Sequence, residues 1–580
     1  MILTILRIMF LWFLLAGIFM FVHYKFKIKK EFVIPITFLV VILILFLASL
    51  LNVIKIVTIL IYLFGLFGYY YLFIKKKLNK DFLKEFYDYK TIIIGSLILF
   101  VTIISYCLEF TSYDNFSHWA LISKQLFMHD CLPSFEYNAD DFTTYPPGSA
   151  LFIYFIGLLV GKTEHAMILG QAYLIIGILS SLMVLFKDKN KLLSSILFIV
   201  FTLFIFVSNV VITDLLIDTL LGVLGILSVL FAYYYRDNIK KAGILLAMMS
   251  CVFIIFKNSG FLFITMNVLL MLIIGFRNKN IKKSLLYIVL MLLCAAGFFY
   301  LWQHHLLMVY YDQSGLTTKH SISVANAMKN LGQNGYENSL AVIDVYLKNF
   351  ININNLINWY MIGINIVLIL LICLYKNNRK NIFKVLILCD VLYLCYWAAY
   401  GVLYVLSMPF AEAIVLACYN RYMMSCIIVL IGIVLIAVYE LCVDKKSKIC
   451  LTCFIILFIF LIFNNGINRP YSLIGVDYYK GSERENIQKI IKENDLESYK
   501  QDNLIVYMEE CSLETYISYM FRYELLKRNV RAACGNIDFS TINEETVIFV
   551  PNNNKEIIEK FDDDNFEKIK TKFYKYTPSN

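Results

Sequence analysis

FVIPITFLVVILILFLASL, residues 32–50, runs for 19 residues without a charged side chain. A helix needs roughly 20 apolar residues to cross the hydrocarbon core of a bilayer. The stretch has that length and therefore predicts a transmembrane helix. Similar stretches recur along the whole 580-residue chain, of which 60% is apolar. This composition is typical of polytopic membrane proteins.

Fourteen such segments are long enough to be considered as transmembrane helices. They lie near residues 2–23, 32–50, 53–74, 91–109, 166–186, 192–210, 213–235, 241–256, 260–276, 284–302, 357–375, 382–406, 421–441 and 449–466. Two of them, 241–256 and 260–276, are short, so this pair is either two spans, one broken helix or a re-entrant pair. The expected fold class is a polytopic α-helical membrane protein with about 12–14 transmembrane helices.

Lysines and arginines gather in seven short connections between these segments. They lie within 25–30, 75–90, 187–191, 236–241, 277–283, 376–384 and 445–448. With fourteen spans all seven fall on one face, which the positive-inside rule makes cytoplasmic. The net charge of +10 thus reflects membrane topology, and we expect no nucleic-acid partner. Both termini, the loops 110–147 and 303–356 and the tail after Asn465 are then extracytoplasmic.

The chain divides into four parts. These are N-terminal transmembrane helices (1–109), a first large extracytoplasmic loop (110–165), a transmembrane core (166–466) with a second outer loop at 303–356, and a soluble extracytoplasmic domain (467–580). Segment 147–160 is too short to cross the membrane comfortably, and we expect a helix along the outer interface that begins after Pro146 and Pro147.

The last part has a different composition, because hydropathy falls and charge rises after Asn465. Strands are predicted at 503–508 and 546–551, and helices at 484–494, 513–526 and 554–561. Alternating strands and helices predict a small α/β domain with a parallel or mixed sheet. Cys511 and Cys534 both lie in this domain, and a disulfide between them is compatible with its location.

The most polar part of the first outer loop is YDNFSHW, residues 113–119. Asp114 follows the fourth span by five residues, at the membrane–water boundary, where a carboxylate can act as a general base. An aspartate here can equally cap a helix. We group Asp114 and His118 as catalytic candidates, and Asp141 and Tyr145, near the end of the same loop, as candidates for substrate binding.

Three cations stand on the outer side, against the charge bias of the chain: Lys124, Lys257 and Arg421. Together they predict a positive pocket, since lysine holds phosphate as a point charge and arginine can bind it through two hydrogen bonds. Lys124 can also simply extend to the interface. Tyr422 adjoins Arg421 and is a further candidate for substrate binding.

Asp214 and Asp218 are predicted to lie one turn apart at the start of the seventh span. The helix dipole favours acids there, which is a structural explanation for both. We keep Asp214 as a candidate for substrate binding.

The order of these features resembles the GT-C glycosyltransferases that use polyprenyl-phosphate sugars, such as the protein O-mannosyltransferases and the aminoarabinose transferase of lipid A. The features are Asp114, Tyr145-Pro146-Pro147, Gly161 with Glu164, an aspartate near the outer end of a later span, Lys257-Asn258-Ser259-Gly260 and Arg421-Tyr422. The family often has Asp-Glu where this chain has Asp114-Asn115. Its loop usually follows the first span, whereas here it follows the fourth.

The resemblance implies a GT-C-like fold in the cell membrane, with the site on the extracytoplasmic face. It implies inverting transfer of a sugar from a polyprenyl-phosphate donor to an extracytoplasmic acceptor, with Asp114 as base and with Lys257 and Arg421 near the lipid phosphate. It implies no cofactor, and a divalent metal is not predicted. Two alternatives remain: a polysaccharide polymerase or ligase with a lipid-pyrophosphate donor, and a transporter, flippase or sensor without catalysis.

Overall fold

The computed structural model describes residues 2–134, 142–186, 190–208, 212–310, 324–441, 447–464, 481–498, 503–535, 542, 546–551, 566–570 and 572–576. All fourteen predicted segments form helices. The helices of the apolar part are α1 (Ile2–Phe26), α2 (Lys30–Leu50), α3 (Ile54–Ile74), α4 (Lys80–Phe86), α5 (Tyr89–Ser105), α6 (Ala120–His129), α7 (Gly148–Val160), α8 (Glu164–Leu179), α9 (Lys191–Val207), α10 (Ile217–Tyr234), α11 (Ile239–Phe256), α12 (Phe261–Arg277), α13 (Ile281–Val309), α14 (Val324–Phe350), α15 (Leu356–Leu374), α16 (Arg379–Leu406), α17 (Phe410–Ala413), α18 (Tyr419–Leu441) and α19 (Ser447–Asn464).

Eleven helices in the described part of the chain are long and apolar enough to cross a membrane, and a bent pair, α4 with α5, makes a twelfth. The fold is therefore that of a multi-pass helical membrane protein. Of the fourteen predicted spans, α9 and α19 are the two that fall short of this length or apolarity. Both still pack into the bundle, against each other.

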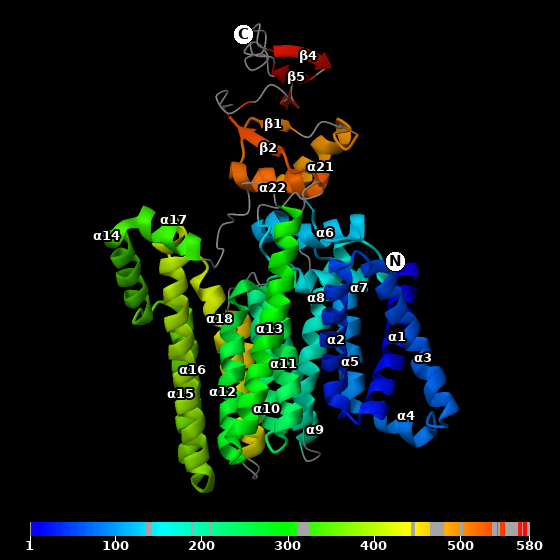
Figure 1. Cartoon of the computed structure of the whole chain (residues 1–580), viewed down its shortest axis with the longest axis vertical. Helices are drawn as coiled ribbons and strands as arrows, with labels where there is room; N and C mark the ends of the chain where they lie inside the picture. The colour runs from blue at the N-terminus through cyan, green and yellow to red at the C-terminus, as the bar shows by residue number, and fades with distance from the viewer. Residues whose placement is uncertain are drawn as a thin grey trace.

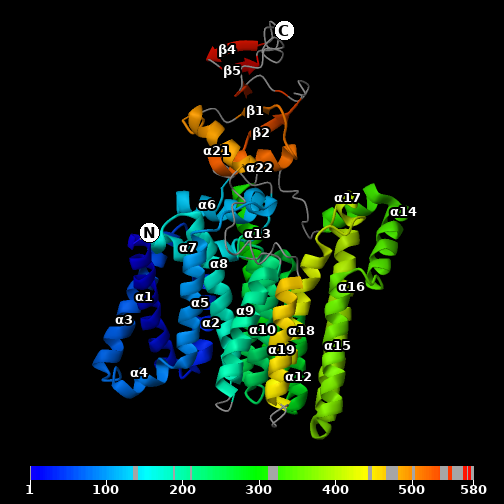
Figure 2. The same cartoon turned by 180° about the vertical axis from the view of Figure 1, so that it is seen from behind.

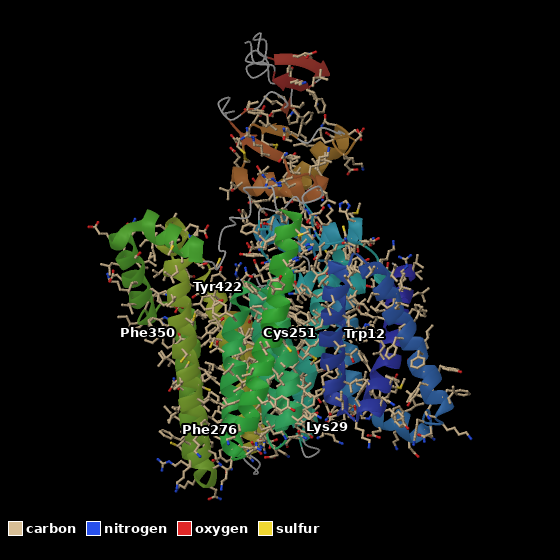
Figure 3. All side chains as sticks on the ribbon, in the orientation of Figure 1. Trp12, Lys29, Cys251, Phe276, Phe350 and Tyr422 are labelled. Atoms are coloured by element: carbon tan, nitrogen blue, oxygen red, sulfur yellow. A yellow bond between two sulfur atoms is a disulfide. The ribbon has the colours of Figure 1, made fainter. Side chains whose placement is uncertain are left out.

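The basic connections gather at one end of the bundle, which we call the basic end. Arg277, the last residue of α12, lies 3.3 Å from Asp237, which follows α10. The ammonium of Lys29, between α1 and α2, lies 4.4 Å from the ring centre of Tyr234 on α10. Figure 3 shows Lys29 and Phe276 at this end and Tyr422 toward the other. The C-terminal domain sits beyond that other end, as Figures 1 and 2 show.

The ambiguous pair 241–256 and 260–276 forms two separate spans, α11 and α12, which turn back on each other at Lys257. The turn contains a short 3-10 helix, Asn258–Gly260. It needs a glycine at 260, since a Cβ atom there would collide with the carbonyl oxygen of Phe253. The tight turn places Lys257 at the end of the bundle opposite the basic loops.

Helix α7 begins directly after Pro147, as predicted, but it does not lie open along the interface. Almost all of its residues are buried, against α8, α6, α2 and α1. The sequence GSALFIYFIGLLV is apolar on every side, whereas a helix exposed along the interface needs a polar face. Helix α7 is instead a packed element of the core.

The C-terminal domain contains a five-stranded mixed sheet. Its described elements are α21 (Glu483–Glu493), β1 (Leu504–Met508), α22 (Glu514–Leu525), β2 (Val530–Cys534), β3 (Val547–Phe549), β4 (Phe566–Lys570) and β5 (Phe573–Tyr576). The strand order is β2-β1-β3-β5-β4; β1 pairs in parallel with β2 and β3, and the remaining pairs are antiparallel. The α/β prediction is confirmed here, while β2, β4 and β5 were not predicted. The helix predicted at 554–561 lies outside the described residues.

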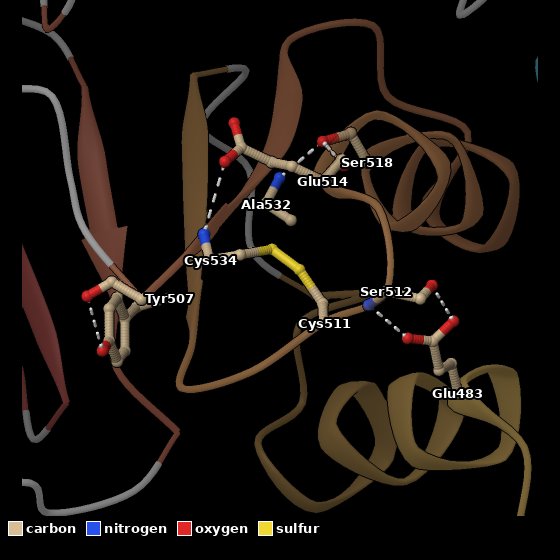
Figure 4. The surroundings of a disulfide bond; sticks show 9 residues. Glu483, Tyr507, Cys511, Ser512, Glu514, Ser518, Ala532 and Cys534 are labelled. Carbon is tan, nitrogen blue, oxygen red and sulfur yellow. Dashed lines mark hydrogen bonds between the residues drawn. A yellow bond between two sulfur atoms is a disulfide. The ribbon is translucent and has the colours of Figure 1, made fainter.

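A disulfide joins Cys511, before α22, to Cys534, the last residue of β2 (Figure 4). The neighbouring Ser512 ties this corner to α21, because its backbone N–H and its hydroxyl both donate to the carboxylate of Glu483, at 2.8 and 2.7 Å. The disulfide and these hydrogen bonds together link β2, the start of α22 and α21. Disulfides persist in oxidising compartments, so the bond requires the domain to lie in one.

Candidate functional site

A chain of alternating charges lies at the end of the bundle that faces the C-terminal domain. The guanidinium of Arg421, in the first turn of α18, contacts the carboxylate of Asp114. Its Nε lies 3.2 Å from Oδ2 of Asp218 on α10. Asp218 in turn accepts a 2.6 Å hydrogen bond from Nζ of Lys257. Three of the four, Asp114, Lys257 and Arg421, are sequence-predicted site residues, and segments more than 100 residues apart bring them together.

Asp218 is the most deeply buried member of the cluster. The Asp218 side chain is 1% exposed, against 10% for Lys257, 18% for Asp114 and 21% for Arg421. Two positive and two negative charges balance, which is the usual condition for charges to be tolerated inside a protein. Charged residues within membrane helices are expensive and are by default candidates for function.

One contact in the cluster is incomplete. Nε of Arg421 and Oδ2 of Asp218 are within ion-pair distance, yet neither has a hydrogen-bond partner of acceptable geometry in the described structure. The Arg421 Nε–H is thus a buried donor with spare capacity. A ligand oxygen that reached it would gain a charge-assisted hydrogen bond.

The backbone around Asp114 is unusual. Asn115–Trp119 forms a single π-helical turn that leads into α6. Such turns are rare and occur frequently at functional sites. The turn is anchored to the segment before α10, because the Asn115 side-chain amide donates a 2.5 Å hydrogen bond to the carbonyl of Thr213. The sequence predicts the start of a helix here. In the structure, the π turn positions Asp114 at the rim of the bundle, facing Arg421.

Asp114 is held in its ionised form. Burial favours the neutral carboxyl, but the Arg421 guanidinium, His118 and the Lys257 ammonium together outweigh it and lower the pKa of Asp114. The direction follows from the opposite charges placed beside the carboxylate. In this state Asp114 is an acceptor only, and a weak base as long as Arg421 stays bound to it.

His118 lies behind Asp114 in a box of aromatic rings. Its Nδ1 lies 2.7 Å from the Ser117 hydroxyl, and its ring packs on Trp119, Phe142 and Tyr145 at 4.5–5.2 Å between centres. Tyr145 also stacks on Trp119 at 5.2 Å. Both predicted residues, His118 and Tyr145, therefore belong to one packed unit that backs the loop.

Tyr422 closes the other side of the cluster. The Lys257 ammonium lies 4.8 Å and the Arg421 Cζ 5.4 Å from the centre of its ring. The ring itself stacks on Tyr400 of α16 at 5.3 Å. A tyrosine face beside two cations adds a cation–π attraction and gives the site a flat apolar wall.

The remaining predicted residues lie elsewhere. Lys124 points to the C-terminal domain, where its Nζ donates to the carbonyl of Tyr523 at 2.8 Å and lies 3.9 Å from the Glu524 carboxylate. Burial in that junction lowers the pKa of Lys124. The expected pocket of three cations is therefore a pair, Lys257 and Arg421. Asp141 lies outside the described residues.

Asp214 lies in the segment that leads into α10. Helix α10 begins at Ile217, and Leu215 has a left-handed backbone (φ 46°), so Asp214 precedes the helix. The expectation that Asp214 and Asp218 share one helical face was wrong for that reason. Asp218 was not among the site residues predicted from the sequence. The available signal was an acid inside the predicted apolar span 213–235.

The C-terminal domain docks directly on the loop that carries Asp114. Arg484 of α21, 5% exposed, binds the carboxylates of Glu164 and Glu524 and donates a 3.0 Å hydrogen bond to the carbonyl of Phe110. The Tyr523 hydroxyl donates to Glu164 at 2.8 Å. Burial opposes the charge, but the two carboxylates raise the pKa of Arg484 above its ordinary value. Sequence analysis missed Arg484, because a lone arginine at a helix start looks like a solvent-exposed residue.

Aromatic contacts complete this junction on both sides of Asp114. Tyr113 packs on Tyr519 of α22 at 5.2 Å, and Phe116 packs on Tyr523 at 5.2 Å. The loop is thus held between the membrane bundle and the outer domain.

No group of three or more His, Cys, Asp or Glu side chains among the described residues is arranged to hold a metal ion.

Comparison of the chain with protein-family models, with curated proteins and with solved structures gave no match.

Proposed function

We propose that the protein is an extracytoplasmic-face glycosyltransferase of GT-C type, which moves a sugar from a polyprenyl-phosphate donor to an acceptor outside the membrane. The observation that carries the proposal is the contact of Arg421 with both Asp114 and Asp218, with Lys257 bound to the far side of Asp218. A carboxylate able to act as base and two cations able to hold a phosphate meet at one end of a membrane bundle.

The charge balance suggests how the donor engages the site. A phosphate that reaches the Arg421 guanidinium competes with Asp114 for it, and the Nε–H of Arg421 offers a donor that the protein leaves unused. Release from Arg421 removes the strongest of the attractions that lower the pKa of Asp114. Donor binding would thus turn Asp114 from a salt-bridge partner into a competent base.

The chemical step then balances without a cofactor. The Asp114 carboxylate takes the proton of an acceptor hydroxyl, and the acceptor oxygen forms a bond to the anomeric carbon. The bond from that carbon to the phosphate oxygen breaks on the opposite face, so the configuration inverts. Its electron pair leaves with the polyprenyl phosphate, whose added charge Arg421 and Lys257 stabilise.

The test is transfer of a labelled sugar by the purified protein in liposomes that contain a polyprenyl-phosphate donor. Asp114→Asn keeps the shape of the side chain and should lower the rate by at least 100-fold, roughly the share supplied by a general base. Asp237→Asn, at the basic end, is the matched control and should transfer normally. Full transfer by Asp114→Asn would reject Asp114 as base.

The same assay separates the alternatives. Transfer only from a lipid-pyrophosphate donor would favour a polymerase or ligase. Movement of a labelled lipid or solute across the liposome membrane without a covalent product would favour a transporter.

A further inference from the structure

A polar cleft of about 1000 Å³ opens between the junction of α14 with α15 and the segment 414–421. Its polar lining comprises five asparagines together with Tyr419, Lys348 and Arg421, and none of the described residues that line it is acidic. Ligand sites usually enclose about 300–1,000 Å³ and are mostly apolar. This cleft is at the upper limit of that range and far richer in amides than a lipid-binding groove.

The cleft and the charged cluster share one side chain. Arg421 lines the cleft and also contacts Asp114. A molecule seated in the cleft therefore approaches the guanidinium that holds the candidate base. The other three charged members of the cluster are not part of the lining, so Arg421 is the charged residue through which the cleft meets the cluster.

The wall that carries Arg421 is built from strained backbone. Leu416 and Cys418 both adopt left-handed conformations, with φ of 49° and 61°, although neither is a glycine. The segment is held in place from both sides: the Ala417 N–H donates to the carbonyl of Glu412 at 3.0 Å, and the Tyr404 hydroxyl donates to the carbonyl of Ala417 at 2.6 Å. Residues kept in sparsely populated conformations by their surroundings cluster at ligand sites.

The lining selects the chemistry of the occupant. An asparagine amide offers both a donor and an acceptor, which matches a hydroxyl group that can also do both. The two lining cations, Lys348 and Arg421, pair with acids outside the lining, Asp344 and Asp114. Because no carboxylate lines the cleft itself, the lining disfavours a cationic ligand and tolerates a neutral or anionic one. We propose that this cleft binds the acceptor of the transfer reaction, a glycan chain that is neutral or anionic and rich in hydroxyl groups. This assignment rests on the proposed function.

Cys418 offers a direct probe of occupancy, because it lines the cleft and its side chain is exposed. The whole protein in liposomes, without donor lipid, is treated with a membrane-impermeant maleimide, and modification of Cys418 is followed by peptide mass spectrometry. The competitors are maltohexaose, as a neutral glycan, and an oligogalacturonate, as an anionic one. We expect at least one of them to slow the modification of Cys418 at least fivefold.

Two lining variants and one control make the result specific. Asn420→Leu removes an exposed amide and Lys348→Met an exposed ammonium, and each should reduce the protection at least threefold. Lys489→Met, on the exposed face of α21, should leave it unchanged. Protection by neither glycan would overturn the assignment, and so would protection by a polyprenyl phosphate instead of a glycan.

Because the probe needs no turnover, its outcome is independent of the transfer assay. Glycan protection without any sugar transfer would uphold the cleft as a glycan site and reject the enzyme. Transfer without glycan protection would uphold the enzyme and place its acceptor elsewhere.

Discussion

Lys257 and Asp218 form a 2.6 Å ion pair that ties the turn between α11 and α12 to the start of α10. The pair is almost fully buried, and Arg421 is the other cation near Asp218. Removal of one partner from a buried pair typically costs about 3–5 kcal/mol, because the other charge stays behind. Lys257→Met should therefore lower the free energy of unfolding by about 3 kcal/mol, the lower figure since Arg421 remains. Denaturant unfolding in detergent micelles measures it.

The double variant Lys257→Met with Asp218→Leu tests whether this loss comes from the pair itself. Residues in direct contact are not additive, so the double variant should lose clearly less than the sum of the two single variants. Additive losses would mean that the two side chains stabilise the fold independently, and the ion pair would not be the reason for the defect.

The Asp114 carboxylate should become protonated only at unusually low pH. Opposite charges lower its pKa, so the carboxylate contributes stability above the pKa of an unfolded aspartate, about 3.9. That contribution is lost only as pH falls through the still lower pKa of the folded state. Arg421→Gln removes the strongest attraction and leaves the burial of Asp114, so the pKa of Asp114 should rise.

Labelling with a carbodiimide, which attacks the protonated carboxyl, measures this shift without any need for turnover. The wild-type protein should label at Asp114 only at strongly acidic pH, and Arg421→Gln at clearly higher pH. Asp237, exposed at the basic end, serves as the internal reference. Identical labelling profiles for the two proteins would contradict the pairing of Arg421 with Asp114.

The fold was largely predictable from sequence because each span is a continuous apolar run of membrane length, as in 32–50. The number of transmembrane spans was less certain at the short segments. Helix α9 and residues 147–160 are both apolar and both short, and only their burial in the structure shows how they pack. Hydrophobic periodicity could not reveal this packing, because a helix that is apolar on every side has no single face that can be predicted to point toward the core.

The candidate site was predictable only in part. Lys257 and Arg421 stood out because they oppose the inward charge bias, and they meet at Asp218. Lys124 carried the same signal but pairs with the C-terminal domain. The sequence holds no information on which acid a cation will reach, so Lys124 could not be distinguished from the other two. For the same reason the role of Arg484, more than 300 residues from Glu164, was hidden.

The disulfide should matter for the C-terminal domain alone. Cys511 and Cys534 are 23 residues apart, and closing a loop of that length stabilises a domain by about 3 kcal/mol. Cys511→Ala with Cys534→Ala should therefore lower the unfolding temperature of that domain and leave the helical part unchanged, as followed by limited proteolysis during heating. Cys131→Ala is the control.

If an impermeant thiol reagent labels Cys511 and Cys534 in intact cells only after reduction, their extracytoplasmic location is confirmed; labelling only after cell lysis would invert the topology.

Arg484 should control whether the C-terminal domain stays docked over Asp114. Its guanidinium joins α21 to Glu164 at the start of α8, to Glu524 of α22 and to the carbonyl of Phe110. Arg484→Gln would leave the Glu164 carboxylate with the Tyr523 hydroxyl but without its cation, so we expect undocking rather than global unfolding. Protease cleavage between the bundle and the domain should accelerate at least tenfold. Arg531→Gln, on β2 away from these contacts, is the matched control. Because docking holds both flanks of Asp114, undocking should also lower sugar transfer, and normal transfer by an undocked Arg484→Gln protein would show that the domain does not position the loop.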